Sequence, residues 1–270
     1  MLLAFASRVF LTKPEMNLTL YPLAGLPLVS PGDDLAELIT RTLTQHGLTL
    51  QDGDVLVIAQ KVVSKAEGRL VNLTTIEPSE DALEYARITS KDPRLVELIL
   101  SESREVVRAR KNLLIVEHRL GFISANAGID HSNVSGPWGE AEDWVLLLPE
   151  NPDESARGIR EKLEQRYGCQ VGVLIIDSHG RAWRLGTIGM TIGLSGLPGL
   201  VDLRGEPDLF DYRLRVTQVA ASDELAAGAS LVMGQAHEGL PVVLARGFPY
   251  PLREATLSEL IREKDHDLFR

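Results

Sequence analysis

Two apolar runs, residues 54–59 and residues 171–176, constrain the fold of this chain more than any other feature. Each run is short, rich in aliphatic residues and followed directly by polar side chains, which is typical of a buried strand. The first run leads into Gln60 and Lys61, and the second leads into Asp177. Because ligands of open α/β sheets bind at the carboxyl ends of the strands, the sequence predicts an α/β protein with a site at these two ends.

A polar loop of small residues, residues 124–133, supplies a second acid, Asp130. Together with Asp177, the Ser178 hydroxyl and the Gln235 amide, it makes a set of oxygen donors, and no His or Cys spacing typical of a zinc site accompanies them. Such donors favour a hard cation, Mg²⁺ or Mn²⁺. Spacing alone leaves the alternative open, and indeed favours it, that the two acids only cap turns.

Lys61 and Lys65 are four residues apart, so both lie on one face if the chain turns helical after residue 59. There they would meet phosphates as compact cations. The alternative is a solvated basic pair beside Glu67, which spacing alone favours because most lysines are exposed. The Walker A pattern is absent, so a bound nucleotide would need a different cradle.

The sequence alone assigns no catalytic residue. His118, His131 and His179 are candidate general bases, but no G-x-S-x-G elbow surrounds them, and we interpret them as neutral loop or edge residues. Cys169 has no partner cysteine and precedes an apolar run, which is typical of a buried, unreactive thiol.

Composition excludes several classes of function. The formal net charge is −10 and no basic block occurs, so we expect no nucleic-acid partner. No apolar stretch reaches the roughly 18 residues of a membrane span, so we expect no membrane association. One cysteine excludes an internal disulfide and favours a reducing, cytoplasmic compartment. A chain of 270 residues is long enough for one large or two small domains.

The remaining pattern predicts alternating helices and strands. We expect Ser30 to Asp33 to cap a first helix that runs to Gln45, and Ser222 to cap a last one. The other expected helices are residues 79–104, broken at residues 92–93, and residues 152–167. Further strands are expected at residues 18–23, 105–109, 113–116 and 241–245, and the glycine-rich residues 185–205 predict close packing or a bulged strand.

Seven segments, in this order, resemble the coenzyme F420-0:L-glutamate ligase family, also called F420 gamma-glutamyl ligases. They are residues 26–29 (LPLV), 54–68 (DVLVIAQKVVSKAEG), 125–133 (ANAGIDHSN), 148–153 (LPENPD), 177–184 (DSHGRAWR), 223–226 (DELA) and 233–235 (MGQ). The resemblance implies a GTP-dependent ligase that adds L-glutamate to the lactyl carboxylate of F420-0 through an acyl phosphate, and often adds further γ-linked glutamates. The chain resembles the stand-alone form, which has no nitroreductase domain.

The resemblance also implies a fold: a two-lobed, mixed α/β (α+β) protein with mixed sheets flanked by helices, assembled as an intertwined homodimer. On that basis we expect residues 1–17 to be a poorly ordered N-terminal extension, residues 18–250 to be the ligase domain with interleaved lobes, and residues 251–270 to be a C-terminal helical tail.

The family's binding residues carry over onto matching positions of this chain. The resemblance implies that Asp130, Asp177, Ser178 and Gln235 bind divalent Mg²⁺ or Mn²⁺, and the family pattern adds K⁺ as a further cation. The implied contacts to GTP are Leu26, Pro27, Leu28, Val29, Gln60, Lys65, Asn133, Met233, Gly234, Gln235, Ala236, His237, Glu238, Gly239 and Leu240.

This chain departs from the family pattern at a few positions. Ser178 and His179 stand where we expect a threonine and an aromatic residue, and Asp211 stands where the family tends toward glycine. The hydroxyl ligand is kept. Two other functions stay open: a catalytically silent nucleotide-binding dimer, and a metal-dependent phosphatase that would use the same acids to activate water.

Overall fold

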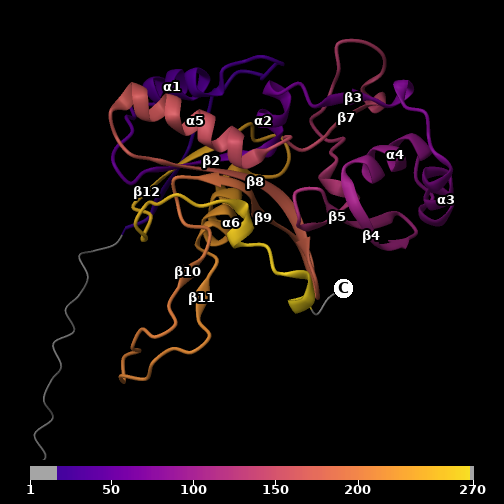
Figure 1. The fold of residues 1–270 in the computed structure, drawn as a ribbon. Coiled ribbons are helices and arrows are strands. Elements are labelled where there is room, and N and C mark those ends of the chain that lie inside the picture. Colours follow the sequence, from indigo (N-terminus) through magenta and orange to yellow (C-terminus); the bar gives the residue numbers. More distant parts are fainter. Residues whose placement is uncertain (1–16, 268–270) are drawn as a thin grey trace, which may run out of the picture.

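The computed structural model describes residues 17–267, so residues 1–16 of the expected extension lie outside the described residues. The described chain is a mixed α/β fold with one five-stranded sheet and three smaller sheets (Figure 1), which confirms the mixed α/β part of the predicted fold class. Its elements are β1 (Thr19–Pro22), α1 (Leu35–Gln45), β2 (Val55–Ala59), α2 (Gln60–Ala66), β3 (Leu70–Asn72), η1 (Leu73–Thr75), α3 (Glu80–Thr89), α4 (Pro93–Ser101), β4 (Ser103–Arg110), β5 (Leu113–His118), β6 (Ile123–Ala125), η2 (Asn126–Gly128), η3 (Ala141–Asp143), β7 (Trp144–Leu146), α5 (Pro152–Tyr167), β8 (Gly172–Arg181), β9 (Arg184–Ser195), β10 (Val201–Asp202), β11 (Gln218–Val219), α6 (Ala221–Met233), β12 (Val242–Arg246), η4 (Leu257–Glu259) and η5 (Lys264–His266).

The two apolar runs are neighbouring strands of the five-stranded sheet, whose order is β1-β12-β2-β8-β9. Strands β2 and β8 pair in parallel, from Val55 opposite Gly172 to Ala59 opposite Ile176, whereas the other pairs are antiparallel. The parallel pairing ends at Ala59 and Ile176, so Gln60 and Asp177, the next residue of each segment, lie at the same edge of that pairing. Strand β8 itself continues to Arg181, beyond the predicted end at residue 176, because it goes on pairing with β9. The predicted buried strands are therefore confirmed, and their parallel register places the candidate site.

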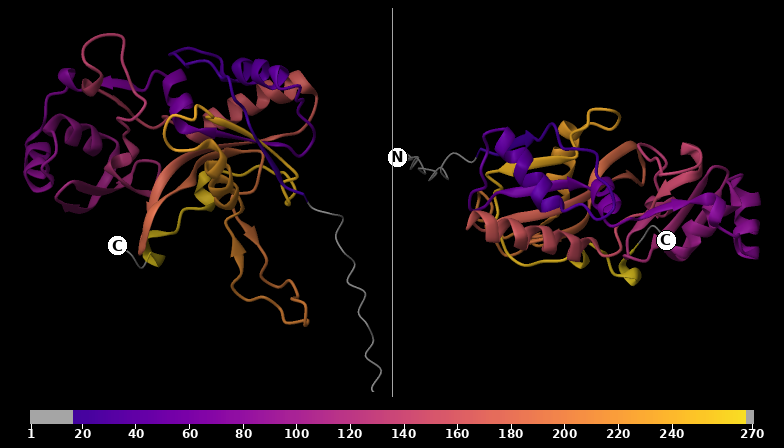
Figure 2. Two further views of the ribbon diagram at one scale, coloured as in Figure 1. Left: turned by 180° about the vertical axis from the view of Figure 1, so that it is seen from behind. Right: turned by 90° about the horizontal axis from the view of Figure 1, so that it is seen from above.

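Helices cover both faces of this sheet: α1 and α5 lie on one face, and α6 lies on the other (Figures 1 and 2). Side chains alternate along a strand. Leu56 and Ile58 therefore belong to the core beneath α1 and α5, whereas Val55 and Val57 belong to the core shared with α6. Both faces of β2 are buried, which explains why its sequence is apolar throughout.

Glycines let the helices approach β9 closely. A Cβ at Gly189 would lie 2.5 Å from the carbonyl oxygen of Ala226 in α6, and a Cβ at Gly193 would lie 2.3 Å from the Pro152 side chain in α5. Either contact is closer than non-bonded atoms tolerate, so only glycine fits. The expectation of a bulged, closely packed strand within residues 185–205 is confirmed, since the β8–β9 pairing also carries register shifts.

The predicted helices are present, although some of their ends differ. Helix α1 ends at Gln45 as expected, but its N-cap is Asp34, one residue beyond the expected cap segment. Asp92 caps α4 and separates it from α3. Ser222 lies inside α6, which begins at Ala221 without a side-chain cap, so its expected capping role was wrong. Within the described part of the chain, no helix is long and apolar enough to cross a membrane.

Residues 70–147 form a smaller lobe that inserts between α2 and α5, beside the five-stranded sheet (Figure 1). This small lobe contains α3, α4, the three-stranded sheet β4-β5-β6 and the two-stranded sheet β3-β7. The rest of the described chain is the large lobe. Because the chain leaves the large lobe after α2 and returns to it at α5, the two lobes are interleaved in sequence.

A buried ion cluster connects the lobes. Glu102, at the end of α4, accepts hydrogen bonds from Arg69 at 2.8 Å and from Arg119 at 2.9 Å. Both arginines also donate to carbonyl oxygens at the start of the large lobe, those of Leu148 and Glu150. Burial alone would raise the pKa of Glu102, but the two arginines outweigh it and the pKa is lowered. The cluster therefore stays charged and fixes how the lobes meet.

Two segments extend from the large lobe. Strands β10 and β11 form the base of a long arm that projects away from the sheet (Figure 1), and its outer residues Leu209, Phe210 and Val216 are exposed. The C-terminal residues 247–267 contain the 3₁₀ turns η4 and η5 joined by irregular chain, where a helical tail was expected. This tail crosses to the small lobe, where Lys264 pairs with Glu105 at 2.8 Å.

His118 lies fully buried where the lobes meet. Its Nδ1 accepts a hydrogen bond from the backbone of Leu120 at 3.1 Å, and its ring stacks on Phe122 at 5.1 Å. Burial lowers the pKa of His118 to about 4, although the nearby Glu102 opposes this shift; Arg119, His179 and Arg69 lower the pKa further. The imidazole is therefore neutral in the folded protein at neutral pH.

We predict that His118 makes the protein less stable in mild acid. Since the unfolded histidine binds a proton below about pH 6.5 and the folded one binds it only below about 4, the stabilisation present at pH 7 is lost as pH falls between these values. In a His118→Asn variant the side-chain oxygen can still accept from Leu120. The slope of the unfolding free energy against pH should become shallower by up to about 1.4 kcal/mol per pH unit, the contribution of one proton. Urea unfolding from pH 7 to 5 measures it; parallel curves for variant and wild type would contradict it.

Candidate functional site

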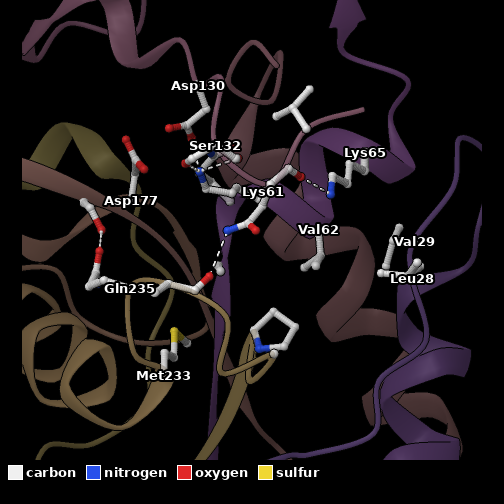
Figure 3. Close-up of a pocket in the computed structure, with 18 of the residues that line it drawn as sticks. Leu28, Val29, Lys61, Val62, Lys65, Asp130, Ser132, Asp177, Met233 and Gln235 are labelled. Atoms are coloured by element: carbon white, nitrogen blue, oxygen red, sulfur yellow. Dashed lines mark hydrogen bonds and ion pairs between the residues drawn. The ribbon is translucent and has the colours of Figure 1, made fainter. Parts of the chain in front are cut away.

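A cleft of about 1290 Å³ opens where the pairing of β2 with β8 ends (Figure 3). Its floor is the start of α2 and the middle of β8, and residues 28–31 line one side. Residues 128–137 of the small lobe form one wall, and residues 233–241, which follow α6, form the other. The cleft therefore collects segments that are far apart in the sequence, at the sheet edge that the sequence predicts.

Asp130 enters this cleft from the small lobe and is held by the first turn of α2. The Gln60 amide nitrogen donates to Asp130 Oδ2 at 2.7 Å, and the Lys61 ammonium lies 3.0 Å from the same oxygen. Burial raises the pKa of Asp130, and the nearby charge of Asp177 adds to this effect; Lys61 and Gln60 oppose it. The two acids are thus close enough to interact (Figure 3).

Asp177 and Ser178 are consecutive residues of β8, just beyond its pairing with β2, and both line the cleft. The Ser178 hydroxyl donates to Gln235 Oε1 at 2.7 Å, and the Gln235 amide donates to Ser230 of α6 at 3.0 Å. These bonds place the side-chain oxygens of Ser178 and Gln235 beside each other. His179 is 8% exposed, and its Nε2 lies 3.1 Å from Asp177 Oδ2. Three separate segments thus bring the four expected oxygen donors to one cleft.

The loop that follows Asp130 connects the two walls of the cleft. Lys65 donates to the Asn133 carbonyl at 2.8 Å, Lys61 donates to the Ser132 hydroxyl at 2.9 Å, and the Asn133 amide donates to the Ala236 carbonyl at 3.0 Å. The two lysines are therefore engaged at the cleft, so the solvated surface pair favoured by spacing alone was wrong. Burial lowers the pKa of Lys65, and Lys61 adds to this effect.

The structure brings together most of the residues that the family pattern implies. All four implied metal ligands line the cleft, and so do all the implied nucleotide contacts except two. The exceptions are Leu26, which packs against the core of the large lobe, and Pro27. Of the candidate bases, His118 is buried between the lobes, and His179 contacts Asp177 from outside the cleft lining.

Sequence reasoning missed two features of the site. One is Ser64, a fully buried serine whose hydroxyl donates to Gln60 Oε1 at 2.9 Å. The spacing of four residues between Gln60 and Ser64 on a helix was the available signal. The other is the role of residues 134–137 as a cleft wall, where Gly136 packs on the Trp144 ring so closely that a Cβ would lie 1.9 Å from it.

The donor set fits a hard cation held jointly by protein and substrate. Among residues 17–267, no group of three His, Cys, Asp or Glu side chains could hold a metal by itself. Two carboxylates, a hydroxyl and an amide oxygen are instead the ligand type of Mg²⁺, which is usually bound by one or two carboxylates, with substrate phosphates and water completing its coordination. The cleft thus suits a cation that binds to these donors and whose coordination a phosphate-bearing ligand completes.

These features define an α/β enzyme that presents acidic oxygen donors and lysines to a substrate cleft. Comparison with known proteins agrees: the F420-0:gamma-glutamyl ligase family matches residues 25–247. The chain belongs to this family, and it is an amide-forming ligase.

Several archaeal relatives, each named coenzyme F420:L-glutamate ligase, resemble the chain over nearly its whole length. The protein of Methanothermobacter thermautotrophicus is 45% identical over 257 residues, which cover 94% of this chain and 100% of that protein. The protein of Methanopyrus kandleri is 47% identical, covering 90% of this chain and 93% of the relative. The protein of Methanocaldococcus jannaschii is 43% identical, covering 91% and 94%. The matched part of the chain therefore corresponds to nearly the whole length of each of these relatives.

Proposed function

We propose that the protein joins L-glutamate to the lactyl carboxylate of coenzyme F420-0, using GTP to activate that carboxylate as an acyl phosphate. The observation that carries this proposal is the cleft beyond the paired parts of β2 and β8, whose lining brings Asp130 and Asp177 together with Lys61 and Lys65. An anionic triphosphate and an anionic carboxylate repel each other, so they can react there only if cationic groups neutralise their negative charge. The same chemistry would extend the product by further γ-linked glutamates.

Activation is required because a carboxylate and an amine do not condense spontaneously in water. Transfer of the γ-phosphoryl group makes the carboxylate an acyl phosphate, and the glutamate nitrogen then displaces phosphate as the amide forms. Catalysis of such a transfer consists mainly of holding the reactants in line and stabilising charge. The two cleft walls would hold the reactants in line, because Asn133 connects the walls through its hydrogen bond to Ala236.

Asp130, Asp177, Ser178 and Gln235 would hold the divalent Mg²⁺ or Mn²⁺ that the family pattern implies, with K⁺ as a further candidate. A cation bound there supplies charge neutralisation for the phosphoryl group. The protein residues orient it, because Asp130 is fixed by α2 and Gln235 is fixed by Ser178 and Ser230.

The nucleotide would lie along the wall formed by residues 233–240. Gly234 has a φ of +74° and leaves no room for a Cβ, which would lie 2.2 Å from Glu238, so the chain turns sharply after α6 and exposes its backbone to the cleft. Lys65 reaches the opposite wall and would meet the phosphates as a point charge. Leu28 and Val29 close the apolar side of the cleft.

Mass spectrometry of protein incubated with GTP, Mn²⁺ and F420-0, with and without glutamate, tests the proposed reaction. We expect a glutamylated product only when glutamate is present. Release of phosphate without any product would support the phosphatase alternative, and no turnover of GTP would support the silent dimer.

Asp130→Asn and Asp177→Asn should each abolish ligation and keep the fold, because each removes a charge that the cation needs. Near wild-type turnover by either variant would contradict the proposal that these two acids bind the metal.

Lys65→Met should raise KM for GTP and lower kcat. A charge-assisted contact of this kind contributes about 1.5–3 kcal/mol, which corresponds to a tenfold to hundredfold loss in kcat/KM. The matched control is Lys162→Met, since Lys162 is exposed on α5 and, among residues 17–267, pairs only with Asp34. Lys61 is unsuitable as a control because it contacts Asp130. Steady-state kinetics with equal losses in Lys65→Met and Lys162→Met would refute the phosphate contact.

We also propose that the protein is a homodimer in which the arm carrying β10 and β11 packs against the second copy. Its outer side chains Leu209, Phe210 and Val216 are 66%, 88% and 84% exposed, and a cluster of exposed apolar residues is typical of an interface. Light scattering should give twice the mass of the chain, and Phe210→Glu should shift the protein toward half of that mass. A wild-type monomer at micromolar concentration would contradict this assembly.

A further inference from the structure

The carboxylate of Asp130 is held on one side only. Oδ2 receives the Gln60 amide at 2.7 Å and faces the Lys61 ammonium at 3.0 Å. Among the described residues, Oδ1 makes no hydrogen bond to a side chain or to the backbone of another residue. Two donors on one oxygen fix the plane of the carboxylate and leave the other oxygen available to a ligand.

The two donors differ in rigidity. The Lys61 side chain is 28% exposed, and its ammonium is shared between Asp130 and Ser132, so it does not hold Asp130 alone. Gln60 is 1% exposed and is held at both ends of its amide: Nε2 donates to Asp130, and Oε1 accepts from Ser64 at 2.9 Å. Ser64 is 0% exposed. The amide therefore cannot rotate without leaving a buried polar atom unpaired.

This hydrogen-bond chain has a defined direction. A carboxylate oxygen only accepts, so Asp130 takes the NH₂ end of the Gln60 amide, and the carbonyl end accepts from the Ser64 hydroxyl. Ser64 and Gln60 are one helical turn apart on α2, and α2 follows β2 without a gap. The central sheet, acting through α2, therefore sets the orientation of the Asp130 carboxylate, although Asp130 itself comes from the small lobe.

We propose that Ser64, acting through Gln60, is a positioning residue that orients Asp130 and directs Oδ1 toward the divalent cation. This inference rests on the proposed metal site. In this proposal Gln60 orients Asp130 in addition to any contact that it makes with the nucleotide. Ser64, which touches neither substrate nor cation, holds the Gln60 amide. Partners that orient a metal ligand are often nearly as important for affinity as the ligand itself.

Mn²⁺ affinity measured without nucleotide tests the proposal. Titration followed by electron paramagnetic resonance, which detects free Mn²⁺, gives the dissociation constant for wild type, Ser64→Ala, Gln60→Met and the double variant. Gln60→Met keeps the shape and removes the donor, so Mn²⁺ should bind about tenfold to hundredfold more weakly. Ser64→Ala should weaken binding by about two- to tenfold, the effect of one lost hydrogen bond.

The double variant separates positioning from a general loss of structure. If Ser64 acts only through Gln60, then adding Ser64→Ala to Gln60→Met changes the Mn²⁺ dissociation constant no further, so the two effects are not additive. The matched control is Ser222→Ala, which removes an equally buried hydroxyl on α6 that bonds to Thr191 at 3.2 Å. This control should leave Mn²⁺ affinity unchanged, and unfolding midpoints of all variants should show that each one folds.

Each result either supports or overturns the inference. Wild-type Mn²⁺ affinity in Gln60→Met or in Ser64→Ala overturns it while leaving the metal site intact, provided that Asp130→Asn still abolishes binding. Additive losses in the double variant also overturn it. If wild type and Asp130→Asn bind Mn²⁺ equally, the proposed metal site fails, and this inference falls with it.

Discussion

The parallel pairing of β2 with β8 is the constraint on which the site depends. Its register places Ala59 opposite Ile176, so the residues just beyond the paired segments, Gln60 and Asp177, lie at the same edge. Both strands are buried on both faces, and a shift of one residue would exchange those faces. The apolar runs that stabilise the sheet therefore also fix the separation of the polar groups at its edge. Stability of the core and geometry of the cleft are set by the same pairing.

The second requirement is that the small lobe delivers Asp130 to that edge. The cluster of Glu102 with Arg69 and Arg119 fixes the lobes at their junction, and the contacts of Gln60 and Lys61 with Asp130 fix them at the cleft. Buried ion pairs add little net stability, but removing one partner leaves an uncompensated charge. Their effect here is specificity: they allow few relative positions of the lobes. A site assembled from two lobes needs this restriction, because its acids are not neighbours in sequence.

Local patterns predicted those parts of the fold that local physics decides. The two buried strands, the break before α4 and the glycines that admit α6 were all predicted from hydrophobic periodicity, proline and glycine. Asp177 was predicted as a site residue because it ends a strand. The expected cap at Ser222 was wrong because helix ends depend on the preceding chain path, which tertiary packing sets.

Contacts between distant segments were beyond the sequence pattern. Nothing in the spacing of Lys61 and Lys65 indicates the loop at Ser132 and Asn133, so the solvated pair was the natural interpretation. The resemblance to a family supplied those residues as a set, without saying what each contacts. Only the structure shows that Gln60 bonds to Asp130 and to Ser64, and that Leu26 packs into the core instead of lining the cleft.

The charge balance of the cleft indicates how cation and nucleotide would cooperate. Asp130 and Asp177 are the acids of the proposed metal site, and Lys61 and Lys65 stand beside them, so the four side chains nearly cancel. A divalent ion added to this set meets Asp130, which already faces the Lys61 ammonium, and it gains further neutralisation when phosphates arrive. Phosphates, in turn, meet stronger attraction once the ion is present. Each ligand should therefore raise the affinity for the other by the same factor, because coupling between two sites is reciprocal.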